Sequence, residues 1–263
     1  MPAIQAIYRY PIKGLTPEPL AATALRPGQT VPGDRIYAIE NGPSGFDPAA
    51  PAHLPKQRFL MLMRNERLAT LRATFDQVSQ TLAVAQSPPP SPVPGSEGGR
   101  QGTSGNLTTP EGRAAIERFF AAFCADELRG PPKVLFAAGH SFSDVARKVV
   151  SIINLASVRA LEEAAGASID PLRFRANVYV EDWPAWHEFD LLGQTLAVGS
   201  AARLKVVKRI VRCAATNVDP QTGLRDLALP QTLQQTYGHA DCGVYAEVIE
   251  GGDIEVGDAI GVV

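Results

Sequence analysis

The chain has 263 residues, of which 45% are hydrophobic and 20% are charged, so it can bury a substantial core without disulfides. Lys and Arg number 25 against 27 Asp and Glu, and the net charge of -2 excludes a domain built mainly to neutralise nucleic acid or an anionic membrane surface. No run approaches the roughly 18 apolar residues of a membrane span and no signal peptide is evident, so we expect a cytoplasmic protein without a membrane span.

The first third of the chain predicts strands. Apolar and polar residues alternate over 4–10, and further strands are expected over 36–39 and 81–85. The segment 59–75 fits either one helix or two short strands. A stretch rich in Pro, Gly and Ser follows, and its composition buries too little apolar surface to offset the entropy of ordering it. We therefore expect residues 87–108 to form a disordered loop.

Two helices are expected after this loop. The first starts at the N-cap Thr109 with a proline in its first turn, repeats apolar residues on one face and stops before Gly130. Cys124 lies on that apolar face and should pack in the core. The second helix follows the β-branched run 149–154 and places Ser157 in its first turn. A helix start after a strand can bind an anion through free N–H groups, but many purely structural helices begin in the same way.

The remainder of the chain predicts short strands with frequent turns, including a hairpin around Glu250–Asp253. This pattern favours a barrel or sandwich over a doubly wound parallel sheet. The glycine-rich nucleotide motifs and the G-x-S-x-G motif of hydrolases do not occur in the sequence.

Cys213 stands out among the candidate reactive residues. The apolar alternation of 204–213 changes phase at Val206 and Val207, which predicts a bulge that re-aims the end of a strand. Cationic residues precede Cys213, and a turn built around Asp219 and Gly223 follows it. Nearby cations favour the thiolate, which is both a nucleophile and a metal ligand. A buried free cysteine at a strand end would give the same pattern.

Other cations gather in short segments. If RFRAN is extended, Arg173 and Arg175 point the same way, and with Asn177 they suit a phosphate or a polar heterocycle. Lys13 lies in a loop between a proline and a glycine, and Arg35 starts a strand. Surface ion pairs on a solvated strand would explain the same residues.

The cysteines and histidines also limit the chemistry. The three cysteines are widely separated and cannot supply the four ligands of an ordinary iron–sulfur cluster, so electrons would have to come from another protein. The four histidines are isolated, and a zinc site would need long-range assembly. A Cys/His hydrolase is not excluded by spacing, because such partners need not be close in sequence.

Taken in order, YRYPIKGL, GDRIYA, HSFSD, NLASVRAL, RFRAN, RCAATNVDPQTG and EGGDIEVGDAI resemble the MOSC superfamily, proteins related to the C-terminal domain of molybdenum cofactor sulfurase. The first two segments look like the β-barrel domain that precedes MOSC in the subgroup of the mitochondrial amidoxime reducing component. The resemblance implies a β-rich α+β fold with few peripheral helices. It divides the chain into an N-terminal barrel domain over 1–86, the loop 87–108 and a MOSC barrel domain over 109–263.

The resemblance also implies a cofactor, the pyranopterin dithiolene that carries molybdenum, with Cys213 as the ligand of the metal. A soft thiolate suits a metal that sulfur already holds. Where the family often has Ser and Pro, this chain has Gly14 and Ala176. The positions expected to contact the pterin and its phosphate are Lys13, Arg35, Ser157, Arg173, Arg175, Asn177 and Thr216.

The function implied by the resemblance is reduction of small N-hydroxylated compounds, with Cys213 as the catalytic residue and an iron–sulfur or flavin protein as electron donor. The alternative from another class is a non-catalytic carrier that holds the cofactor, or a persulfide sulfur, on Cys213. A Cys-dependent hydrolase is the third hypothesis.

Overall fold

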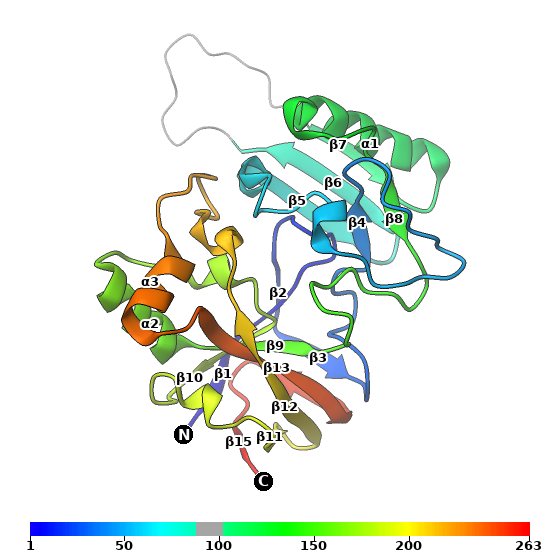
Figure 1. The fold of residues 1–263 in the computed structure, drawn as a ribbon. Helices are drawn as coiled ribbons and strands as arrows, with labels where there is room; N and C mark the ends of the chain where they lie inside the picture. The colour runs from blue at the N-terminus through cyan, green and yellow to red at the C-terminus, as the bar shows by residue number, and fades with distance from the viewer. Residues whose placement is uncertain (88–101) are drawn as a thin grey trace.

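The computed structural model describes residues 1–87 and 102–263, and its largest element is an eight-stranded sheet. Its strands, in spatial order, are β15 (Ile260–Val262), β11 (Thr195–Val198), β12 (Ala202–Val211), β13 (Asp241–Glu250), β9 (Val150–Asn154), β10 (Val178–Glu181), β1 (Ala3–Arg9) and β2 (Glu18–Leu20). Ile4 N donates to Asp258 O at 2.9 Å and Ile260 N to Pro2 O at 3.0 Å. The sheet therefore curls until β15, near the C-terminus, meets the start of β1 (Figure 1). Apolar side chains from seven of these strands fill the interior, and Leu20 of β2 packs against them while partly buried.

Strand β12 shows how the sequence pattern sets this interior. Leu204 and Val206 are buried, whereas Lys205 between them is exposed. The pairing with β13 shifts between Val206 and Lys208, which confirms the predicted bulge and turns the last residues of β12 toward a second unit of the molecule.

Helices α2 (Leu155–Ala165) and α3 (Leu229–Tyr237) lie side by side on the outside of the sheet (Figure 1). Asn154 caps α2 by accepting from Ala156 N at 3.0 Å, and Gly166 ends it with φ 65°. The strand and helix predicted from 149–166 are confirmed.

The second unit contains the sheet β5 (Leu71–Asp76), β6 (Thr81–Gln86) and β7 (Gly102–Asn106), covered by α1 (Pro110–Phe123), together with the pair β4 (Tyr37–Ile39) and β8 (Val134–Phe136). Thr109 caps α1 by accepting from Gly112 N at 3.1 Å. A Cβ on Gly112 would lie 2.0 Å from Asn106 O, so glycine is needed for the helix to approach β7. Cys124 is buried with this core, as predicted.

Four local predictions need correction. Residues 102–106 of the predicted loop form β7, and residues 88–101 lie outside the described residues. Helix α1 ends at Phe123, earlier than the predicted stop before Gly130, because the chain tightens into a 3-10 turn over Ala125–Glu127.

The segment 59–75, expected as one helix or two short strands, supplies a 3-10 turn and most of β5. Strand β14 (Gly252–Glu255) pairs with β3 (Ala22–Leu25) and not with β13, so the predicted hairpin is wrong.

The β-rich α+β class with few helices is confirmed. Residues from both sides of the expected loop share each unit: β1 and β2 belong to the eight-stranded sheet, and β8 pairs with β4 in the second unit. The division at 86 and 109 stays a prediction. Among the described residues, no helix is long and apolar enough to cross a membrane.

Candidate functional site

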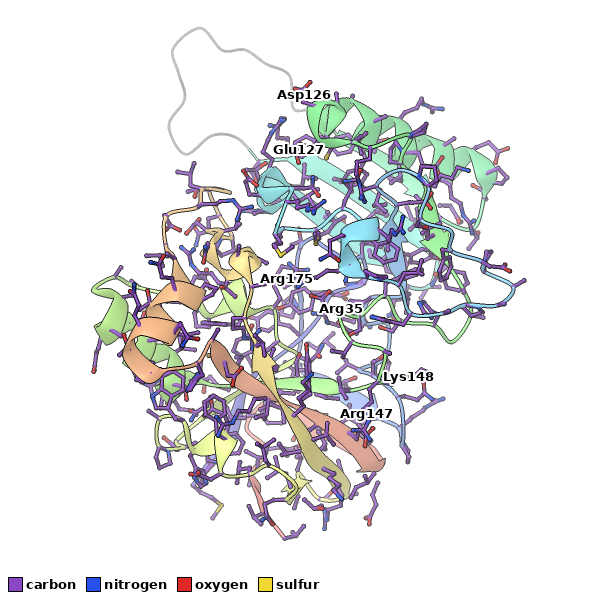
Figure 2. The ribbon with its side chains drawn as sticks, viewed as in Figure 1. Arg35, Asp126, Glu127, Arg147, Lys148 and Arg175 are labelled. Carbon is purple, nitrogen blue, oxygen red and sulfur yellow. The ribbon has the colours of Figure 1, made fainter. Side chains whose placement is uncertain are left out.

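A cavity of about 290 Å³ opens where the end of β12 meets the second unit. Its wall contains eight Lys and Arg side chains and only two carboxylates, in contrast to the net negative charge of the whole chain. Figure 2 shows two of these arginines, Arg35 and Arg175, close to each other between the two units. The structure brings to this cavity every predicted site residue except Ser157: Lys13, Arg35, Arg173, Arg175, Asn177, Cys213 and Thr216.

Cys213 lies two residues beyond the end of β12 and is partly exposed. Thr216 fixes its backbone, since both the N–H and Oγ1 of Thr216 donate to Cys213 O at 3.0 Å. The next turn is organised by Asp219, whose Oδ1 accepts from the backbone N of Thr222 at 2.7 Å and of Gln221 at 2.9 Å. The predicted turn is therefore present, and it presents the thiol at the cavity wall.

Arg225 connects this loop to the second unit. Its guanidinium donates to Ala214 O at 3.0 Å, immediately after Cys213, and to Met63 O at 2.8 Å. It also pairs with Glu66 at 2.9 Å. The loop that carries Cys213 is thus held against residues 63–66 of the second unit, which are remote from it in sequence.

A small ionic cluster lies beside the thiol. Asp144 accepts from the ammonium of Lys13 and, at 3.3 Å, from that of Lys56. Lys13 is 5% exposed and also donates to Phe142 O at 2.8 Å, while the Lys56 ammonium lies 3.2 Å from Cys213 Sγ. Although burial opposes ionisation, the two ammonium groups hold the pKa of the Asp144 carboxyl well below its usual range. The cluster places an anion between two cations next to the sulfur.

Two further cations lie on one aromatic ring. The guanidinium carbons of Arg35 and Arg175 are 4.7 and 4.3 Å from the centroid of the Tyr10 ring, and Arg35 donates to Arg175 O at 2.9 Å. Both arginines have positive φ, 52° and 51°, a conformation that costs free energy outside glycine. Burial raises the pKa of Tyr10 to about 12, so it stays a neutral platform. Burial lowers the pKa of Arg175, and the neighbouring Arg35 lowers it further, so a bound anion would stabilise the pair.

Arg173 and Arg175 do not point the same way, as they would in an extended segment. RFRAN is not extended, because residues 171–174 form a 3-10 turn and Arg175 is left-handed. Arg173 is almost fully buried and pairs with Asp226 at 2.7 Å and Asp219 at 3.1 Å. It also donates to Asn217 O at 3.1 Å. Arg173 therefore fastens the loop that carries Cys213.

The Asn177 side chain is also engaged within the protein. Its oxygen accepts from Ser151 N at 3.1 Å and Ser151 Oγ at 2.8 Å, and its nitrogen donates to Tyr8 O at 3.2 Å. These bonds join β9, β10 and β1 at the cavity floor. Asn177 lines the cavity, but its amide is committed to holding the sheet together.

Ser157 lies outside the cavity, away from the other residues expected to contact the cofactor. Its hydroxyl donates to Glu188 Oε2 at 2.8 Å and accepts from Trp186 N at 2.7 Å. Burial raises the pKa of Glu188, which has no cation beside it among the described residues. The start of α2 faces this buried carboxyl because the helix packs on the outside of the sheet. It is a structural helix start.

Sequence reasoning missed several residues of the wall. Lys56 stands in a proline-containing loop with no distinguishing pattern, and Asp144 was not among the candidate site residues. Tyr245 could have been found from the alternation of β13, where Val244 and Ala246 are buried in the sheet interior and the residue between them faces the other way. Met61 and Met63 complete an apolar part of the wall.

Gly14, beside Lys13, adopts a backbone conformation that favours glycine. Its φ is 83°, and a Cβ there would lie 3.1 Å from Leu60 O. Serine at this position would be strained, so the neighbouring Lys13 reaches Asp144 from a turn that requires glycine.

Comparison with known proteins gives one domain match. Residues 137–261 match the family model described as MOSC domain. No curated protein matches the chain. YiiM from Geobacillus stearothermophilus is 24% identical over 43% of this chain and 53% of its own, so about half of its length is matched, with a TM-score of 0.34. The YuaD protein from Bacillus subtilis is 14% identical over 99% of this chain and 94% of its own, with a TM-score of 0.44.

Proposed function

Because residues 137–261 match the MOSC domain family model, we propose that the cavity binds the molybdenum-carrying pyranopterin and that the protein reduces small N-hydroxylated compounds. The observation that carries the proposal is the partly exposed Cys213 thiol at the wall of a strongly cationic cavity. The whole chain is slightly acidic, so this local excess of positive charge indicates a specific anionic ligand.

The thiol suits the metal of this cofactor. A thiolate is a soft ligand, appropriate for a metal that a dithiolene already holds. In the described ranges, no three His, Cys, Asp or Glu side chains gather into a metal site, so Cys213 would be a single protein ligand added to those of the cofactor. The other two cysteines are buried.

The cationic wall suits the phosphate. In the described part of the chain, four arginines and lysines of the wall have no carboxylate partner: Arg175, Lys208, Arg209 and Arg212. Arg35 keeps its ion pair to Asp34 while lying beside Arg175 on Tyr10. An anion bound beside Arg35 and Arg175 would offset the mutual repulsion of these two guanidinium groups and gain charge-assisted hydrogen bonds.

The reaction proposed is R–NHOH + 2e⁻ + 2H⁺ → R–NH₂ + H₂O, and the bound cofactor would supply the redox chemistry. The chain's own residues bind and orient. Lys13 and Asp144 hold Lys56 beside the thiol, and the Lys56 ammonium is a proton-bearing group next to Sγ. We propose that the electrons come from a separate iron–sulfur or flavin protein, since the three cysteines are too few for an ordinary cluster.

The activity is tested by incubating the purified protein with an artificial low-potential donor and benzamidoxime, and measuring benzamidine. We expect donor-dependent product that is lost when the protein is expressed without molybdate. Product formation that is independent of molybdate supply would contradict the proposal, and so would the absence of product from protein that carries the cofactor.

The partly exposed thiol also suits a carrier that holds the cofactor or a persulfide on Cys213. Cyanide-labile sulfur without molybdenum would identify the sulfur carrier, and transfer of molybdenum to an apo-enzyme without turnover would identify the cofactor carrier. The hydrolase hypothesis loses support, because none of the four histidines lines the cavity.

A further inference from the structure

Lys56 has a particular relation to Cys213. Among the residues that the structure describes, it is the only one whose side chain hydrogen-bonds to the Sγ atom, at 3.2 Å. We propose that Lys56 tunes the reduction potential of the metal held by Cys213, raising it through this contact. The inference rests on the proposed function, because it concerns the metal that the thiol would bind.

The contact is built by elements far apart in sequence. Lys56 begins the 3-10 turn Lys56–Arg58, and the next residue, Phe59, is buried and packs edge-to-face on Phe142 with ring centroids 5.4 Å apart. Phe142 O in turn accepts from Lys13. The packing of this turn therefore places the Lys56 ammonium between the sulfur and Asp144.

The charge balance leaves net positive charge at the sulfur. Asp144 is shared between Lys56 and Lys13, so one carboxylate faces two ammonium groups. Asp144 is 45% exposed, and its Oδ2 lies 3.3 Å from the Lys56 nitrogen. The carboxylate fixes the position of Lys56 without cancelling the charge of the pair.

A donor to a ligating sulfur withdraws electron density from the metal–sulfur bond and stabilises the reduced, more negative state of the metal. Hydrogen bonds to ligand sulfurs and nearby charge are established means by which proteins set metal potentials. Removing the ammonium of Lys56 while keeping the length of the side chain should therefore shift the potential downward.

The chain offers a matched control. Lys208 lines the same cavity, but in the described ranges it has neither a hydrogen bond to Cys213 nor a carboxylate partner. Lys208→Met removes the same charge from the same wall without touching the sulfur. A Lys56→Arg variant retains a cationic donor.

The test measures molybdenum content and then the midpoint potential of the bound molybdenum, by redox titration monitored by EPR. We expect Lys56→Met to have a lower potential than wild type, with Lys56→Arg and Lys208→Met close to wild type. An equal shift in Lys56→Met and Lys208→Met would overturn the proposal, and so would no shift in either.

Cofactor content separates the remaining outcomes. A Lys56→Met protein that folds but carries no molybdenum would also overturn the proposal, because Lys56 would then be needed for binding. Wild-type protein without molybdenum would instead contradict the proposed function, and the inference would fall with it.

Discussion

Replacing Cys213 by alanine is expected to reduce benzamidoxime turnover by more than about 100-fold, since even residues that only support a metal ligand typically cost 10–100-fold. The thiol is the one cysteine exposed to the cavity, and in the described ranges no other group of potential ligands gathers around it. The assay is benzamidine formation per chain at saturating donor.

Cys124→Ala is the matched control. Cys124 is buried behind α1 in the second unit, away from the cavity wall, so the substitution should cost about 1 kcal/mol of stability and leave turnover unchanged. Full activity of Cys213→Ala would contradict the assignment of Cys213 as the catalytic residue.

Arg173→Met is expected to lower the free energy of unfolding by about 3 kcal/mol, the lower end of the cost of breaking a buried ion pair, because its partners remain partly hydrated. The side chain of Arg173 is 2% exposed, whereas Asp219 and Asp226 are 22% and 43% exposed. The substitution removes the guanidinium donor from Asp226, from Asp219 Oδ2 and from Asn217 O, although Asp219 Oδ1 keeps its backbone donors. Urea unfolding measures the change.

The comparison for Arg173 is Arg159→Met. Arg159 is 54% exposed and pairs with Glu181 at the surface, an arrangement that contributes about 0–1 kcal/mol. If the two variants lost comparable free energies of unfolding, Arg173 would not fasten the Cys213 loop as described.

The sequence predicted those parts of the site that depend on local chemistry. The phase change at Val206–Val207 predicted the bulge in β12, and the residues after Cys213 predicted the Asp219 turn. Both follow from patterns within a few residues, since strand alternation and turn chemistry are local.

The parts that could not be predicted depend on long-range packing. Lys56 reaches Cys213 across 157 positions of sequence, and only the docking of the second unit on the end of β12 brings them together. The position of Ser157 outside the cavity could not be predicted for the same reason: a helix start can bind an anion, but the face of the sheet on which α2 packs decides whether that start meets the cavity.

Backbone conformation decides where the two arginines of RFRAN lie. Only an extended segment would point Arg173 and Arg175 the same way, and the 3-10 turn over Pro171–Phe174 with the left-handed Arg175 sends them in different directions. One fastens the Cys213 loop, and the other lies on Tyr10.

The central claim, a molybdenum-pterin site at Cys213, is tested most directly by elemental and pterin analysis of wild type and Cys213→Ala purified side by side after expression with molybdate. The account predicts molybdenum and pterin in equal amounts in wild type, with the metal lost from the variant. Wild-type protein without molybdenum, or equal molybdenum in both proteins, would contradict it.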